Sequence, residues 1–136
     1  MTLRLSATVL AQDEAERIGG CIESLRFCDE VLVVDGGSRD RTREVASRLG
    51  ARVVERPFDD FARQHEFARA EARGDWVLSI DADERASAEL AARAPSALDG
   101  AAGAAMAWAR AYEAWVRYAR LWELSRFPES ARDALR

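Results

Sequence analysis

The sequence has no lysine, a single histidine and only two cysteines among its 136 residues, and these shortages limit what the chain can be. Cys21 and Cys28 lack the spacing of a zinc site and lie in or just after a predicted helix, so we expect buried thiols in a reducing compartment. No apolar run approaches the roughly 20 residues that span a bilayer. Residues 1–4 lack the apolar core of a signal peptide. The expectation is a cytoplasmic protein.

Composition and charge are those of a soluble globular domain. The chain is 49% hydrophobic and 32% charged, and its formal net charge of -4 gives no reason to expect a nucleic acid as a partner. The charge is unevenly distributed, because residues 100–136 hold six arginines against four acids, whereas residues 1–99 hold fourteen against twenty. We therefore expect an acidic domain over residues 1–99 and a basic, tryptophan-rich tail over residues 100–136.

Strand and helix patterns alternate along the first ninety residues. The apolar runs predict strands at residues 3–10, 31–34, 52–55 and 76–80. Helical periodicity predicts helices at residues 15–27, 41–49, about 60–73 and 87–97. This alternation is typical of an α/β fold, with a parallel Rossmann-like sheet and helices on both faces. In finer detail, we expect residues 76–80 and Phe61, Phe67 and Ala68 to be buried, and Pro95 to break the last helix.

Acidic loops follow three of the predicted strands. Ligands of parallel sheets bind beyond the carboxyl ends of the strands, so residues 11–14, 35–38 and 81–84 should share one rim. Asp81 and Asp83 point the same way in an extended backbone, and two crowded carboxylates repel each other unless a cation lies between them. A hard divalent ion whose coordination shell is completed by substrate phosphates fits this pattern. The alternative is an acidic, solvated turn.

The segment from Asp35 to Ser38 contains two glycines but is not a dinucleotide fingerprint. It lacks the G-x-G-x-x-G order and follows the second strand rather than the first. A carboxylate beside glycines suits hydrogen bonding to a base or a ribose. A plain turn, with Ser38 or Asp40 capping the next helix, is the alternative.

Three segments follow one another along the chain: LSATVLAQDE at residues 5–14, VVDGGSRDRT at residues 33–42 and GDWVLSIDADE at residues 74–84. Together they resemble glycosyltransferase family 2, and most closely its bacterial lipopolysaccharide core enzymes. The resemblance implies an A-type glycosyltransferase fold, a nucleotide-diphosphate sugar as donor, with a UDP-sugar favoured, and Mg²⁺ or Mn²⁺ as cofactor. It also implies a lipid-linked or glycan acceptor of the cell envelope, such as the lipopolysaccharide core.

The same resemblance implies roles for individual residues. The nucleotide-sugar site would contain Ala11, Asp13, Glu14, Asp35, Gly37, Ser38 and Asp81. The loop at residues 11–14 and Asp35 would hold the nucleobase, Asp81 would lie near the ribose, and Asp83, together with Asp81, would bind the metal. The family usually has Lys-Asn pairs where this chain has Gln12-Asp13 and His65-Glu66. His65 either replaces a lost cation or is an ordinary solvated histidine.

The end of the chain departs from the family pattern. Relatives continue beyond the Asp-x-Asp segment with strands that build the acceptor pocket and supply the catalytic base, whereas residues 106–127 predict an amphipathic helix. This predicts a donor-binding half whose C-terminal half is missing or replaced, with no identifiable catalytic base. Residues 104–127 then contact an anionic membrane surface, cover the sheet or pair with a second copy. A truncated, non-catalytic interaction module is the alternative function.

Overall fold

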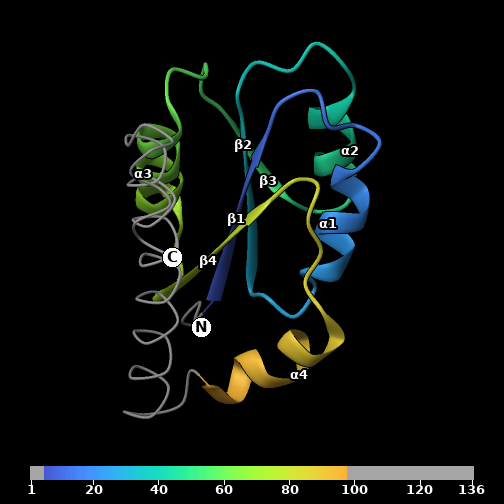
Figure 1. Cartoon of the computed structure of the whole chain (residues 1–136), viewed down its shortest axis with the longest axis vertical. Coiled ribbons are helices and arrows are strands. Elements are labelled where there is room, and N and C mark those ends of the chain that lie inside the picture. Colours follow the sequence, from blue (N-terminus) through green and yellow to red (C-terminus); the bar gives the residue numbers. More distant parts are fainter. Residues whose placement is uncertain (1–4, 98–136) are drawn as a thin grey trace, which may run out of the picture. The chain divides into compact units, whose positions relative to one another are not determined.

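The computed structural model describes residues 5–97, which form four strands and four helices (Figure 1). The strands are β1 (Leu5–Ala11), β2 (Glu30–Asp35), β3 (Arg52–Glu55) and β4 (Trp76–Asp81). The helices are α1 (Ile18–Ser24), α2 (Thr42–Arg48), α3 (Phe61–Glu71) and α4 (Ala88–Ala97). Nearly all of this part lies in one compact unit, Met1–Pro95. The predicted tail, residues 100–136, lies outside the described residues.

The four strands form one parallel sheet in the order β3-β2-β1-β4. Ala11 pairs with Asp35 and Leu10 pairs with Asp81, so the ends of β1, β2 and β4 meet at one rim, as predicted. The chain adds β2 and β3 on one side of β1 and then crosses to place β4 on the other side. In such sheets the ligand crevice opens where the direction reverses, which here is between β1 and β4.

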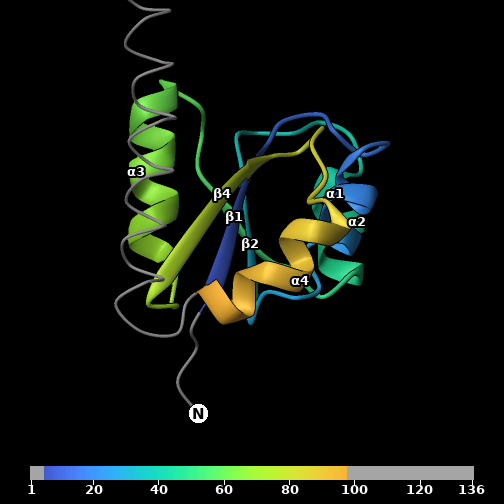
Figure 2. The ribbon, with the colours of Figure 1, turned by 60° about the horizontal axis from the view of Figure 1, so that its bottom comes forward.

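Helices cover both faces of the sheet, which confirms the predicted fold class (Figures 1 and 2). Ala7 and Val9 of β1 belong to the larger apolar cluster, with residues of α1 and α2. Leu10 turns to the other face and joins the smaller cluster with Leu32 and with Ala68 of α3. Successive residues of a strand point to opposite faces, so a strand that is covered on both faces is apolar throughout.

Glu30 ties together several chain segments at the opposite end of the sheet. Its carboxylate accepts hydrogen bonds from the Ser6 hydroxyl at 2.6 Å, the Arg73 backbone N–H at 2.9 Å and the Arg52 guanidinium at 2.9 Å. Burial raises the pKa of Glu30, but these three hydrogen bonds outweigh it and leave the pKa below its usual value. Gly74 lies so close that an added Cβ would be 2.8 Å from the Ser6 backbone nitrogen.

Two expectations about burial were wrong. β4 is not buried on both sides, because it is an edge strand among the described residues and its Val77 side chain is 37% exposed. Phe61 is 70% exposed rather than buried, because it begins α3 at the sheet rim. Phe67 and Ala68 lie further along α3 and do pack against the sheet.

Two expectations about helix boundaries were also wrong. The first helix does not begin at Ala15, because residues 15–17 form a turn in which the Arg17 N–H donates to the Glu14 carbonyl at 3.0 Å. It begins at Ile18 and ends at Ser24, well before Phe27. Pro95 does not break α4, which continues to Ala97. No helix within residues 5–97 is long and apolar enough to cross a membrane.

Candidate functional site

A cleft of about 300 Å³ opens at the carboxyl ends of the strands. It lies between the loops that follow β1 and β4, with the beginning of α3 as a further wall. Its lining residues are Leu10, Ala11, Gln12, Glu14, Val34, Gly36, Phe58, Phe61, Gln64, Asp81, Ala82 and Asp83. The cleft therefore occupies the crevice where parallel sheets of this topology bind ligands.

A tight turn carries the acidic residues into the cleft. The Glu84 N–H donates to the Asp81 carbonyl at 3.0 Å, and the Glu84 carboxylate accepts from the Asp81 N–H at 3.0 Å. Asp81 and Asp83 are exposed and line the cleft, and Ala82, between them in the sequence, is buried. The structure therefore places both Asp81 and Asp83 on the cleft, through a turn rather than an extended strand. The third carboxylate, Glu84, closes the turn.

Cys21 supports this turn from the core. Its buried thiol lies 3.5 Å from the Asp81 carbonyl oxygen, to which it donates. Burial raises the pKa of Cys21 to about 11, and the negative charges of Glu84, Asp81 and Asp83 add to this effect. Burial likewise raises the pKa of Cys28 to about 12, with a smaller contribution from Asp29. Both cysteines are free thiols, as expected.

The electrostatics of the turn favour a bound cation. Burial raises the pKa of Asp81, the negative charges of Glu84 and Asp83 raise it further, and His65 acts in the opposite direction. Asp83 has no hydrogen-bond or ion-pair partner within residues 5–97. Those residues include no group of three or more His, Cys, Asp or Glu side chains that could hold a metal ion. Two carboxylates nevertheless fit Mg²⁺ or Mn²⁺ when substrate phosphates and water complete the shell.

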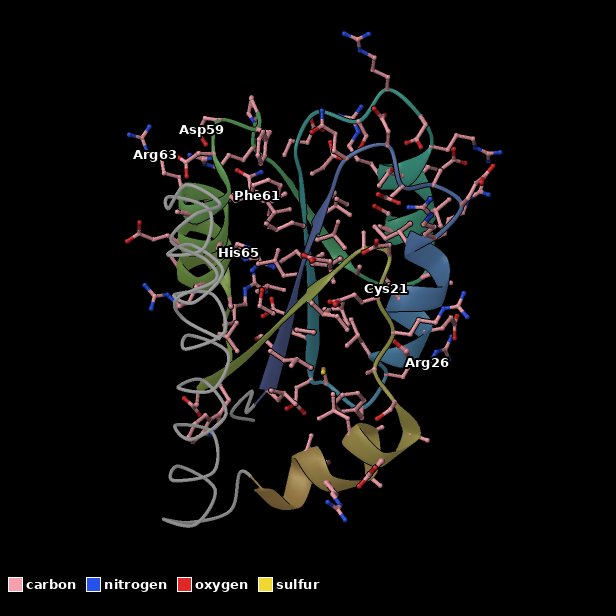
Figure 3. The ribbon with its side chains drawn as sticks, viewed as in Figure 1. Cys21, Arg26, Asp59, Phe61, Arg63 and His65 are labelled. Atoms are coloured by element: carbon pink, nitrogen blue, oxygen red, sulfur yellow. The ribbon has the colours of Figure 1, made fainter. Side chains whose placement is uncertain are left out.

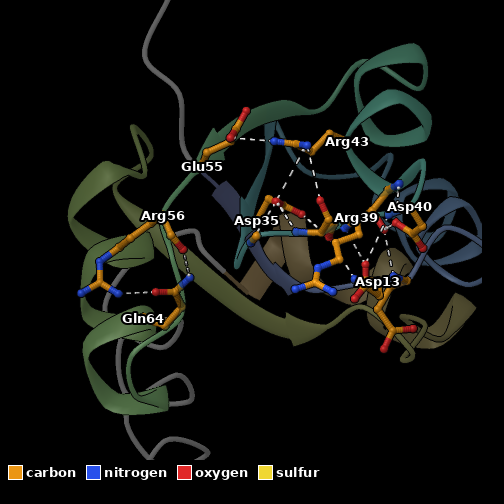
Figure 4. Close-up of polar contacts among 12 residues, drawn as sticks. Asp13, Asp35, Arg39, Asp40, Arg43, Glu55, Arg56 and Gln64 are labelled. Atoms are coloured by element: carbon orange, nitrogen blue, oxygen red, sulfur yellow. Dashed lines mark hydrogen bonds and ion pairs between the residues drawn. The ribbon is translucent and has the colours of Figure 1, made fainter.

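Asp35 faces its own loop rather than the cleft (Figure 4). Its fully buried carboxylate accepts from the N–H groups of Gly37 at 3.1 Å and Ser38 at 3.0 Å, and from the Ser38 hydroxyl. The Arg43 guanidinium lies 3.9 Å away. Gly37 has a φ of 105°, which favours glycine. These contacts are those of a structural turn, and a direct contact between the Asp35 carboxylate and a nucleobase stays a prediction.

Side chains of the same loop fasten the loop after β1 (Figure 4). The Ser38 hydroxyl accepts from the Asp13 N–H at 2.9 Å, and the Asp13 carboxylate accepts from the Arg39 N–H at 2.7 Å. Asp13 adopts a φ of 55°, a conformation that aspartate tolerates better than most residues. The Thr42 hydroxyl accepts from the Glu14 N–H at 2.8 Å. The two loops are thus held in one arrangement before any ligand binds.

The predicted site residues therefore divide into two groups. Ala11, Glu14, Asp81 and Asp83 line the cleft. Asp13, Asp35, Gly37 and Ser38 form or hold the loops behind it. The second group can influence a ligand through the backbone it positions.

An aromatic wall was missed at the sequence level. Phe58 and Phe61, which are 41% and 70% exposed, contact each other edge to face with ring centroids 4.9 Å apart. Gln64 also lines the cleft and is buried; its amide accepts from the Arg56 guanidinium and donates to the Arg56 carbonyl at 2.9 Å (Figure 4). The available signal was a pair of phenylalanines directly after the carboxyl end of a predicted strand.

His65 lies one turn after Phe61 on α3 (Figure 3). Its Nδ1 lies 3.2 Å from the Ser79 hydroxyl of β4, two residues before Asp81. It does not line the cleft, although it acts to lower the pKa of Asp81. His65 is thus neither an isolated surface histidine nor a direct wall of the cleft.

Comparisons with known proteins agree with this geometry. The family model for glycosyl transferase family 2 matches residues 6–136. An uncharacterized glycosyltransferase of Rickettsia bellii is 43% identical over 91 residues, which cover 66% of this chain and 31% of that protein. The lipopolysaccharide core biosynthesis glycosyltransferase LpsC of Rhizobium meliloti is 38% identical over 101 residues, which cover 71% of this chain and 37% of LpsC.

A solved structure shares the same arrangement of strands and helices. Glucosyl-3-phosphoglycerate synthase from Mycobacterium tuberculosis, in complex with Mn²⁺, UDP and glucosyl-3-phosphoglycerate, superimposes with a TM-score of 0.52 at 27% identity. The match covers 61% of this chain and 36% of that protein. The chain spans about a third of the length of the curated relatives it matches.

Proposed function

The chain belongs to glycosyl transferase family 2, and from that premise we propose that it binds a nucleotide-diphosphate sugar, with UDP as the nucleotide, and serves sugar transfer to a glycan or lipid-linked acceptor of the cell envelope. One observation carries the proposal: Asp81 and Asp83 line a cleft at the crevice between β1 and β4. The complex of the mycobacterial synthase with Mn²⁺ and UDP supports the nucleotide. The relationship to LpsC supports the acceptor class.

Asp83, with Asp81, would hold Mg²⁺ or Mn²⁺ against the donor diphosphate. When bound, such an ion neutralises the negative charge that develops on the departing nucleoside diphosphate. Burial raises the pKa of Asp81, and the negative charges of Glu84 and Asp83 raise it further, so a bound cation would stabilise the ionised carboxylate. The turn closed by Glu84 fixes the backbone that carries the two carboxylates relative to the sheet.

The remaining cleft residues position the donor. The loop that contains Ala11, Gln12 and Glu14 is fastened to the loop after β2, so its backbone groups present a fixed surface to the nucleotide. Hydrogen-bonding groups that are already fixed in the free protein reduce the conformational entropy that is lost when a ligand binds. Sugar transfer also needs a base that removes the proton of the acceptor hydroxyl. We assign that role to no residue within 5–97.

Calorimetry with UDP, with and without Mn²⁺, tests the proposal. We expect binding that depends on Mn²⁺, and a loss of affinity of more than tenfold in Asp83→Ala. Asp75→Ala is the matched control, because Asp75 is an exposed carboxylate at the opposite end of β4. Binding that is equal without metal, or equally weakened in both variants, would refute the metal-dependent donor site. The absence of UDP binding to the wild-type chain would favour a non-catalytic interaction module.

A further inference from the structure

Helix α1 joins the two acidic sides of the cleft. At its beginning, the N–H groups of Arg17 and Ile18 donate to the Glu14 carbonyl at 3.0 Å and 2.9 Å. Glu14 lines the cleft on the side of the loop after β1. About one turn further along α1, the Cys21 thiol donates to the carbonyl of Asp81, which lines the other side. The segment after β4 runs beside α1, so one short helix contacts both loops that form the cleft (Figures 1 and 2).

Ser24 of α1 holds the segment that follows the acidic turn, residues 81–84. Its hydroxyl donates to the Cys21 carbonyl at 2.6 Å and accepts from the Ala86 N–H at 3.0 Å. The first of these hydrogen bonds orients the hydroxyl, so that it accepts from Ala86 rather than donating. Ala82 and Ala86 also pack with Cys21 in the larger apolar cluster. Helix α1 therefore contacts the chain on both sides of Asp83, at residue 81 and at residue 86.

Residues 82–86 have few other contacts that fix their backbone. The pairing of β4 with β1 ends at Asp81, which pairs with Leu10. Within residues 5–97, the hydrogen bond from Ala86 to Ser24 is the only one that residues 82–86 make outside the acidic turn. The backbone of this turn sets the position from which the Asp83 carboxylate projects. The contacts with α1 hold that backbone.

We propose that α1 supports the acidic turn, and that Cys21 and Ser24 are positioning residues for the metal ion that binds there. This inference rests on the proposed function and deepens it. Neither Cys21 nor Ser24 lines the cleft, so both act through the backbone and not through a contact with the ligand. The affinity of a metal site depends on how well the surrounding contacts hold its ligands. Loss of either contact should therefore weaken metal binding although both carboxylates remain.

The first test measures by calorimetry how tightly the full chain binds UDP with Mn²⁺. Loss of one hydrogen bond between uncharged groups corresponds to about twofold to tenfold in affinity. We expect a loss of this size in Cys21→Ala and in Ser24→Ala. Cys21→Ser should recover most of the affinity, because a hydroxyl can donate to the same carbonyl. Cys28→Ala is the matched control, because this other free thiol packs against the same apolar cluster and makes no hydrogen bond to the turn within residues 5–97.

Three results of this test would overturn the inference. Wild-type affinity in both Cys21→Ala and Ser24→Ala would show that their contacts do not affect the metal site. An equal loss in Cys28→Ala would show that any change near the core has the same effect. Affinity in Cys21→Ser that is as low as in Cys21→Ala would show that the thiol does not act as a donor. Circular dichroism should confirm that each variant is folded.

The second test observes the turn itself and needs no ligand. The Glu84 N–H, which donates to the Asp81 carbonyl, should exchange with deuterium about twofold to tenfold faster in Cys21→Ala and Ser24→Ala than in the wild type or Cys28→Ala. Unchanged exchange of this amide in both variants would overturn the support of the turn by α1. Failure of the wild-type chain to bind UDP with Mn²⁺ would instead overturn the donor site, so the two proposals fail by different measurements.

Discussion

Substitution of Asp35 tests whether this carboxylate holds the loop or the ligand. In Asp35→Ala, the N–H groups of Gly37 and Ser38 and the Ser38 hydroxyl lose their acceptor. A hydrogen bond to a charged group contributes about 1.5–3 kcal/mol, and the exposed Gly37 can regain part of this from water. We therefore expect the free energy of unfolding to fall by about 3 kcal/mol. The Asp13 N–H should also lose its fixed partner, because it donates to the same Ser38 hydroxyl.

Urea unfolding followed by far-ultraviolet circular dichroism measures this change. With an m value of about 1–1.5 kcal/mol/M for a chain of this size, the midpoint should fall by about 2–3 M. Asp83→Ala is the matched control on the same rim, because an exposed carboxylate without a described partner should change stability by less than about 0.5 kcal/mol. If Asp35→Ala unfolds at the wild-type midpoint, the carboxylate does not hold the loop.

Three further predictions follow from contacts elsewhere in the described chain. Gly74→Ala should lower the free energy of unfolding by about 1–3 kcal/mol, because the added Cβ would clash with the Ser6 backbone. Gly20→Ala should be neutral or stabilise by up to about 1 kcal/mol, because Gly20 lies in a helix and the added Cβ would meet only the movable Arg85 guanidinium. Equal melting temperatures of the two variants would contradict this. The pKa of Glu30 is lowered on folding, so its stabilising contribution is present above about pH 4.5 and is lost as the pH falls through the folded pKa. Glu30→Gln should be less stable than the wild type at pH 7 and should lose less stability on acidification. The urea midpoint of both proteins, measured at a series of acidic pH values, tests this. The pKa of Asp81 is raised on folding, so its ionisation destabilises the metal-free protein as the pH rises above about 4. Asp81→Asn should therefore raise the melting temperature of the metal-free protein at pH 7 and abolish the stabilisation by Mn²⁺ with UDP. A lower melting temperature of the metal-free variant would refute this.

The fold was predictable because its determinants are local. The apolar run before Asp35 and the glycine after Leu49 mark a buried strand and a helix end, and Gly50 indeed has a φ of 87°. Asp60 caps α3, and an aspartate directly before a helical pattern is a common helix cap. Regular alternation of such segments leaves few topologies, so the parallel sheet and its rim followed directly.

The burial of particular side chains could not be read from the same patterns. A period of two in β4 does not reveal whether a further strand covers Val77, and a phenylalanine at the first position of a helix can face the core or a cleft, as Phe61 does. Likewise, an aspartate before two glycines suits either a ligand or its own loop. Only the structure shows that the Asp35 carboxylate holds the loop through Gly37 and Ser38, and its contact with a ligand stays a prediction.

The position of β4 has a consequence for how the cleft responds to assembly. Among the described residues this strand pairs with β1 alone, so half of its backbone groups have no strand partner, and hydrogen exchange there should be faster than in the central strand β1. Asp81 lies at the end of this edge strand. Any segment that paired with the free edge of β4 would slow the local unfolding of this strand. Because Asp81 ends the same strand, such pairing would also raise the affinity of the two carboxylates for a metal ion.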